Sequence, residues 1–123
     1  MRLLAFVSMC LWSLVALAQP VATKEFPADA RVLSVEELKQ ALSGKVFMLA
    51  WVGVTPWRMD FKDNGYLFFD AGTASGSGTW RAESGQVCTE MRAFGNNCNQ
   101  VRMSGELVYY KRLSGEVIAM TPS

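Results

Sequence analysis

The chain contains no histidine, and this limits the chemistry that we expect of it. Histidine is the commonest general base at neutral pH, it activates serine and cysteine nucleophiles, and it is a frequent zinc ligand. Asp60 and Glu90 could form a carboxylate pair, but each has an arginine beside it on its own strand face, which favours surface ion pairs. The segment Asp63-Asn64-Gly65 has the start of a calcium loop without the remaining ligands. We therefore expect no catalytic residue, no metal site, no cofactor and no enzymatic activity.

The N-terminus has the pattern of a secretory signal peptide over residues 1–18. Arg2 precedes a nearly unbroken apolar run from Leu3 to Ala18, and Ala16-Leu17-Ala18 is a cleavage triplet. The run is shorter than the roughly 20 residues that span a bilayer, although an uncleaved signal anchor remains the alternative. We expect a periplasmic or secreted protein with no membrane span after cleavage.

The mature chain that this cleavage would leave is small and electrically neutral. It has 105 residues, with 11 basic and 11 acidic side chains. A neutral surface has no electrostatic footprint for nucleic acid, so no nucleic-acid partner is expected. Two cysteines remain, Cys88 and Cys98, and an even pair in an exported chain predicts a disulfide. Their separation is not that of a Cys-x-x-Cys redox motif.

The elements that would position these residues are one helix and a series of short strands. Residues 19–33 contain Pro20 and Pro27 without any period, which predicts a flexible tether. Ser34 and Glu37 have the spacing of a capping box, and a short amphipathic helix follows and ends at Ser43-Gly44. We expect one β-domain over residues 34–123.

From Lys45 onward, alternating apolar and polar residues predict about eight strands. Connections of hairpin length favour an antiparallel meander, which closes into a small barrel or, as the alternative, remains a strongly curved open sheet packed on the helix. Two longer loops are expected, at Ala71–Gly78 and Ala93–Asn97. The predicted strands are 45–52, 57–62, 66–70, 78–82, 86–92, 100–103, 107–112 and 116–121.

One face of the predicted sheet is apolar and would form the core. Its members are Phe47, Leu49, Met59, Phe61, Leu67, Phe69, Trp80, Val87, Met91, Val101, Met103, Val108, Tyr110, Ile118 and Met120.

A Gly-x-Trp strand at Gly78–Trp80, a Gly-x-x-Cys strand at Gly85–Cys88 and a second cysteine at Cys98 follow the Asp63-Asn64-Gly65 turn. Over residues 33–120 this pattern resembles small secreted proteobacterial proteins of a domain-of-unknown-function type. The resemblance implies a lipocalin-like β-domain in the periplasm or outside the cell. It implies no activity and no catalytic residues.

Aromatic residues offer a binding site. Trp51, Trp57, Tyr66 and Phe68 lie on strands around the Gly53–Pro56 turn, where they would line a barrel mouth that holds an apolar ligand or would serve as core and rim packing.

Phe94 lies in the expected loop between the cysteines, where it would either anchor an interface or fold back on the core. Two functions follow: a non-enzymatic binding module for a small apolar ligand, and a protein-interaction or inhibitor module that docks loop 93–97 on an envelope protein or a foreign enzyme. The identity of any partner is open.

Overall fold

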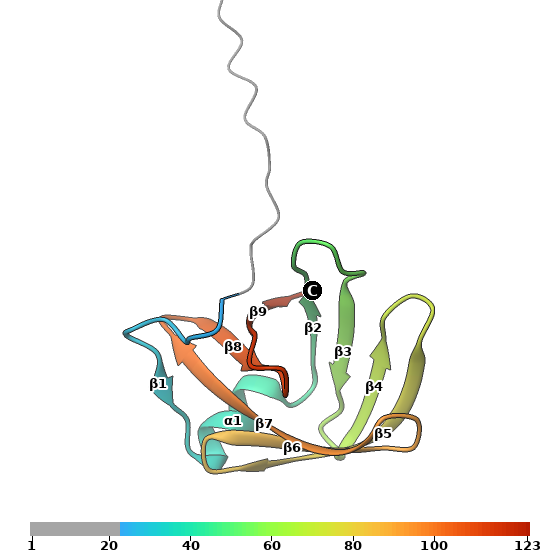
Figure 1. Ribbon diagram of the computed structural model, residues 1–123. Coiled ribbons are helices and arrows are strands. Elements are labelled where there is room, and N and C mark those ends of the chain that lie inside the picture. Colours follow the sequence, from blue (N-terminus) through green and yellow to red (C-terminus); the bar gives the residue numbers. More distant parts are fainter. Residues whose placement is uncertain (1–22) are drawn as a thin grey trace, which may run out of the picture.

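Alternating inward apolar side chains and tight turns arrange the chain as an antiparallel meander in the computed structural model, which describes residues 23–123 (Figure 1). The expected signal peptide at residues 1–18 lies outside the described residues. The elements are β1 (Arg31–Val32), α1 (Val35–Leu42), β2 (Lys45–Leu49), β3 (Trp57–Phe61), β4 (Tyr66–Asp70), β5 (Ser75–Glu83), β6 (Gln86–Met91), β7 (Gly95–Ser104), β8 (Leu107–Lys111) and β9 (Val117–Pro122).

Strands β2 to β9 pair in chain order, and the last returns to the first. Phe47 pairs with Pro122 and Met48 with Thr121, so eight antiparallel strands close into a barrel. Strand β1 adds to β7 as a ninth strand outside this circuit. The expected small barrel with one short helix is confirmed. The alternative of an open sheet is wrong, because β2 pairs with β9.

A meander places alternate connections at the same end of a barrel. The connections β2–β3, β4–β5, β6–β7 and β8–β9 therefore share one end, which we call the mouth. Helix α1 enters β2 at the opposite end and packs against β2 and β5. Leu38 and Leu42 of this helix are fully buried, and the Gly44 N–H donates to the Phe61 carbonyl at 2.7 Å. The helix thus seals the end away from the mouth.

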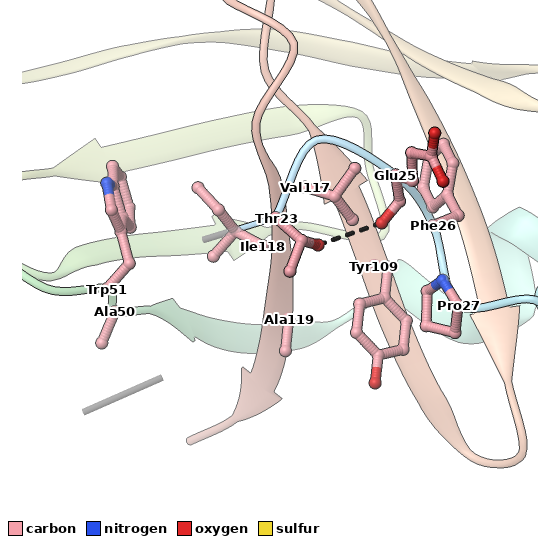
Figure 2. Close-up of a pocket in the computed structure, with 10 residues that line it drawn as sticks. All are labelled: Thr23, Glu25, Phe26, Pro27, Ala50, Trp51, Tyr109, Val117, Ile118 and Ala119. Carbon is pink, nitrogen blue, oxygen red and sulfur yellow. Dashed lines mark hydrogen bonds between the residues drawn. The ribbon is translucent and has the colours of Figure 1, made fainter. Parts of the chain in front are cut away.

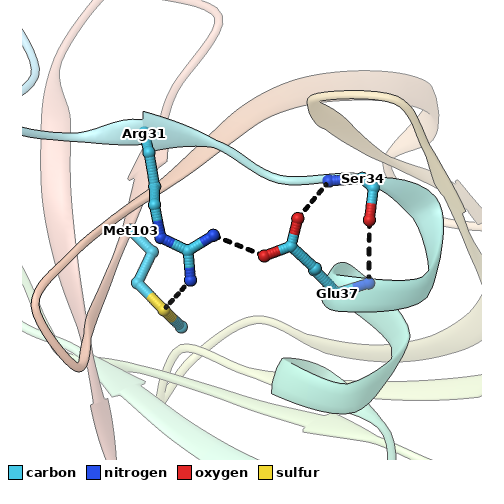
Figure 3. A network of polar contacts seen from close by, with 4 residues as sticks. All are labelled: Arg31, Ser34, Glu37 and Met103. Carbon is cyan, nitrogen blue, oxygen red and sulfur yellow. Dashed lines mark hydrogen bonds and ion pairs between the residues drawn. The ribbon is translucent and has the colours of Figure 1, made fainter.

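The predicted capping box starts the helix. The Ser34 hydroxyl accepts from the Glu37 N–H at 3.2 Å, and the Glu37 carboxylate accepts from the Ser34 N–H at 3.3 Å. Arg31 of β1 pairs with the same carboxylate and reaches the Met103 sulfur of β7 at 3.6 Å (Figure 3). The hydrogen bond from Arg31, followed by that from the Ser34 backbone, lowers the pKa of Glu37. One carboxylate therefore joins the helix start to the barrel wall.

Residues 23–33, which we call the strap, differ from the flexible tether that the prolines suggested. The Val117 N–H of β9 donates to the Thr23 carbonyl at 2.6 Å. The Phe26 ring lies 4.7 Å from the Arg102 guanidinium of β7, and β1 pairs with that strand. Leu33 is only 1% exposed. Backbone pairing at Thr23 and β1, the Phe26 ring and the buried Leu33 therefore attach the strap to the barrel.

The predicted core is confirmed, since every residue expected to face inward is buried or, for Phe69 and Met103, packs against the buried cluster. The two expected loops are wrong in part. Strand β5 begins at Ser75 and β7 at Gly95, so glycine-rich and asparagine-rich sequence is paired strand at both places. The glycine at position 78 is required within strand β5, because a Cβ there would lie 2.0 Å from the Glu90 carbonyl oxygen of β6. Glycine lets β5 cross β6 closely as the barrel bends.

Cys88 and Cys98 form the predicted disulfide. They are directly opposite each other in the β6–β7 register, with Cα atoms 4.0 Å apart. The bond therefore joins the middles of two strands and does not close a loop at their ends, as the expected 93–97 loop had implied.

Trp80 provides a test of the core. Its ring is 8% exposed and packs edge-on to Phe61 at 5.4 Å, and its indole N–H donates to the Lys62 carbonyl at 2.9 Å. We expect Trp80→Ala to lower the free energy of unfolding by roughly 3–5 kcal/mol. Trp80→Phe keeps most of the ring contact and loses the hydrogen bond, so it should cost about 1–2 kcal/mol. Denaturant unfolding measures both, and a loss below about 1 kcal/mol for Trp80→Ala would contradict the packing.

Candidate functional site

A cavity of about 290 Å³ lies inside the barrel at its mouth. One wall is apolar and comes from inward positions of β3 and β4, namely Met59, Leu67 and Phe69. We call this space the mouth cavity. Its full lining is Trp57, Met59, Leu67, Phe69, Ala71, Ala74, Thr89, Met91, Phe94, Asn97 and Tyr110.

The opposite wall is polar. Thr89 of β6, Asn97 of β7 and Tyr110 of β8 line the mouth cavity and also an adjoining recess of about 190 Å³, which we call the polar recess. Asn99 and Arg112 line the recess alone. Strand alternation produces this wall, because Thr89 pairs with Asn97 and both face inward. The barrel interior is therefore divided into an apolar side and a side that can form hydrogen bonds.

Tyr110 remains a neutral phenol across the physiological range. The residue is 8% exposed, and burial raises its pKa to about 12, against a smaller lowering by the nearby Arg112 charge. Within residues 23–123 the hydroxyl forms no hydrogen bond, yet no fully enclosed polar side-chain atom there lacks a partner. The hydroxyl must therefore open onto the cavity that the residue lines.

Four aromatic rings border the mouth in an edge-to-face series. The ring centroids are 5.1 Å apart for Trp51 and Trp57, 5.2 Å for Trp57 and Phe69, and 5.2 Å for Phe69 and Phe94. Such pairs are favourable beyond the apolar area that they bury. The series gives the mouth a stiff apolar rim.

Arg112 completes the rim from the β8–β9 connection. Its guanidinium lies 5.1 Å from the Trp51 ring and 5.0 Å from the Trp57 ring. One of its nitrogens is 2.7 Å from the Glu116 carboxylate. Within the part of the chain that the structure describes, the only cation that lines the two spaces is thus already paired.

The structure brings together three of the five predicted ligand or interface residues. Trp51, Trp57 and Phe94 belong to the rim. Tyr66 and Phe68 lie on the outer face of β4 and are 55% and 46% exposed, because alternation along this strand turns their neighbours inward. Phe94 packs on Phe69 and remains 43% exposed.

Sequence reasoning missed the polar wall. Tyr110 was expected in the core, and Thr89 on the same face as Val87, but neither was connected with a site. Asn97 was assigned to a loop and Asn99 to no element. The available signal was alternation: counting back by twos from the buried Val101 reaches both asparagines.

A second and larger cavity, of about 560 Å³, lies outside the barrel between the strap and the outer face of β8 and β9 (Figure 2). Phe26, Tyr109 and Ala119 are among its walls, and the Thr23 hydroxyl donates to the Glu25 carbonyl at 3.0 Å beside it. We assign the candidate site to the mouth cavity, because its described walls combine an apolar side with a side that can form hydrogen bonds.

Elsewhere in the described chain, Glu83, Cys88 and Cys98 are close enough to suggest a metal site. The two sulfur atoms are bonded to each other, so neither is a thiolate that could bind a metal. Asp60 and Glu90 are in ion pairs, with Lys62 at 3.0 Å and Arg81 at 3.5 Å. Both arrangements are structural.

No family model matches the chain, and no curated protein or solved structure is similar to it. Among residues 23–123, no helix has the length and apolar character needed to cross a membrane. The geometry of the mouth cavity therefore has to support any functional proposal by itself.

The burial of Tyr110 gives a measurable result. An absorbance titration of the three tyrosines should show one ionising near pH 12, and Tyr110→Phe should remove that step. In the unfolded chain the pKa of this phenol is near 10. The stability that the neutral Tyr110 contributes is therefore complete below about pH 10 and is lost as the pH rises toward the folded-state pKa of about 12. A variant titration that keeps the late step would contradict the assignment.

Proposed function

We propose that this protein is an exported, non-enzymatic binding module that holds a small apolar ligand in the mouth cavity. One observation carries the proposal: a closed barrel encloses an apolar cavity that opens at one end and has a few polar groups on one wall. Ligand sites commonly combine these features.

The size of the cavity limits the ligand. A volume of about 290 Å³ is at the lower end of the range for small-molecule sites, about 300–1,000 Å³. If each ligand atom takes roughly as much space as a liquid water molecule, about 30 Å³, the cavity accepts about ten non-hydrogen atoms. Medium-chain aliphatic compounds and single-ring aromatic compounds fit this limit.

The expected affinity is moderate. Burying an eight-carbon chain gains about 6 kcal/mol at about 0.8 kcal/mol for each methylene. Association costs several kcal/mol in lost freedom, and contacts with the rim and hydrogen bonds to the polar wall offset nearly all of this cost. We expect a Kd on the order of 10–100 μM.

The disulfide supports the exported location. Bonds of this kind persist in oxidising compartments and are rare in the cytosol, and Cys88 and Cys98 are bonded. The signal-peptide pattern at residues 1–18 favours the same location.

The alternative, an interaction or inhibitor module that acts through residues 93–97, has less support. Phe94 is exposed enough to serve as an anchor. However, Gly95, Asn96 and Asn97 are paired with β6, and the Phe94 ring packs on Phe69. The hairpin tip therefore fits the role of a cover over the cavity better than that of a projecting docking loop.

Blocking the mouth tests the proposal. Ala74 lines the cavity, whereas its exposed neighbour Thr73 does not. We expect octanol to bind the wild-type protein in isothermal titration calorimetry, and Ala74→Phe to weaken it at least about tenfold, since the new ring fills part of the space. Thr73→Phe adds a ring to the same connection and should leave binding unchanged.

Absence of binding of octanol and also of its charged analogues octanoate and octylammonium to the wild-type protein would contradict the proposed function. Equal weakening by both variants would place the bound molecule outside the mouth cavity.

A further inference from the structure

The polar wall and the Arg112–Glu116 pair also specify the kind of ligand. We propose that the mouth cavity selects an uncharged amphiphile, with its aliphatic or aromatic end against β3 and β4 and a neutral hydroxyl or amide headgroup in the polar recess. This inference rests on the proposed function and adds the charge and orientation of the ligand.

The recess offers neutral hydrogen-bonding groups. The hydroxyls of Thr89 and Tyr110 are free of hydrogen bonds within residues 23–123, and both residues line the mouth cavity and the recess. The Asn99 amide donates to the Lys111 carbonyl at 3.0 Å, which leaves its oxygen as an acceptor. The Asn97 amide makes one long contact, 3.4 Å to the Phe94 carbonyl. A hydroxyl or amide headgroup would find both donors and acceptors here.

These groups also require a polar partner. Thr89 is 7% exposed, Asn99 4% and Tyr110 8%, so water that leaves the recess when a ligand enters has to be replaced. A purely apolar ligand would leave these groups without hydrogen-bond partners, which disfavours its binding. The two walls together therefore favour an amphiphile over a hydrocarbon.

The charges at the rim disfavour an ionised headgroup. Arg112 is the single charged residue among the described residues that line the two spaces. Glu116 occupies one of its nitrogens at 2.7 Å, and the rings of Trp51 and Trp57 lie within about 5 Å of the guanidinium. A carboxylate ligand would have to displace Glu116 or lie beside a like charge, and an ammonium ligand would meet Arg112. A like charge beside either partner therefore weakens the binding of an ionised headgroup relative to a neutral one.

Three probes of equal chain length separate the possibilities: octanol, octanoate and octylammonium, titrated by calorimetry at neutral pH. We expect the wild-type protein to bind octanol at least about tenfold more tightly than either ion. Octanoate binding that equals or exceeds octanol binding would overturn the inference and leave the proposed function standing. Failure of all three probes to bind would overturn the proposed function itself.

A charge variant tests the ion pair. Glu116→Gln keeps the shape of the side chain and leaves Arg112 unneutralised, so octanoate binding should strengthen about tenfold while octanol binding changes less than about twofold. Glu106→Gln makes the same charge change in the exposed β7–β8 turn, away from the mouth, and should change neither. If Glu116→Gln and Glu106→Gln strengthened octanoate binding equally, the inference that Glu116 disfavours an anionic headgroup would be overturned. The wild-type ranking tests the neutral-ligand inference even if the Glu116 variant folds poorly.

Discussion

The pairing of β2 with β9 is the constraint on which the rest of the structure depends. Two residue pairs and the hydrogen bond from the Ser123 N–H to the Val46 carbonyl, at 2.9 Å, join the last barrel strand to the first. Without this short seam the sheet would have two free edges and an interior open along its side. With it, side chains from β3, β4, β6 and β8 surround one space. The mouth cavity exists because the circuit is closed.

The two ends of the barrel are filled differently. At the sealed end, α1 places Leu38 and Leu42 over a core that includes Phe61 and Trp80, and little space remains. At the mouth, small residues of the β4–β5 connection and polar residues of β6 and β7 replace large apolar ones. Gly76 contributes, because its missing side chain leaves room for the Phe94 ring, which lies 3.3 Å from where a Cβ would be. Large apolar side chains fill the sealed end, and the mouth cavity lies at the other.

Sequence patterns predicted the framework better than the site. Alternation and hairpin turns were sufficient for the strand order and the buried face. The spacing of Ser34 and Glu37 predicted the capping box, and the even pair of cysteines in an exported chain predicted the disulfide, so each prediction depended on local periodicity or on a pair of residues. Residues 95–97 and 75–78 were placed in loops because glycine and asparagine usually mark turns, whereas here they are strand residues at a bend. The attachment of the strap and the gathering of Trp51, Trp57, Phe69 and Phe94 depend on barrel closure, which no local pattern contains. Alternation along β4 places Leu67 in the core and therefore turns Tyr66 and Phe68 outward.

Barrel closure can be observed directly by nuclear magnetic resonance. The structure predicts nuclear Overhauser effects between the backbone protons of Met48 and Thr121, together with slow exchange of the Ser123 amide that donates to Val46. Both should be present in the ligand-free protein, since closure depends only on the chain itself. Cross-strand effects throughout the seven hairpins from β2 to β9, with none between β2 and β9, would show an open sheet without an enclosed cavity and would contradict the account.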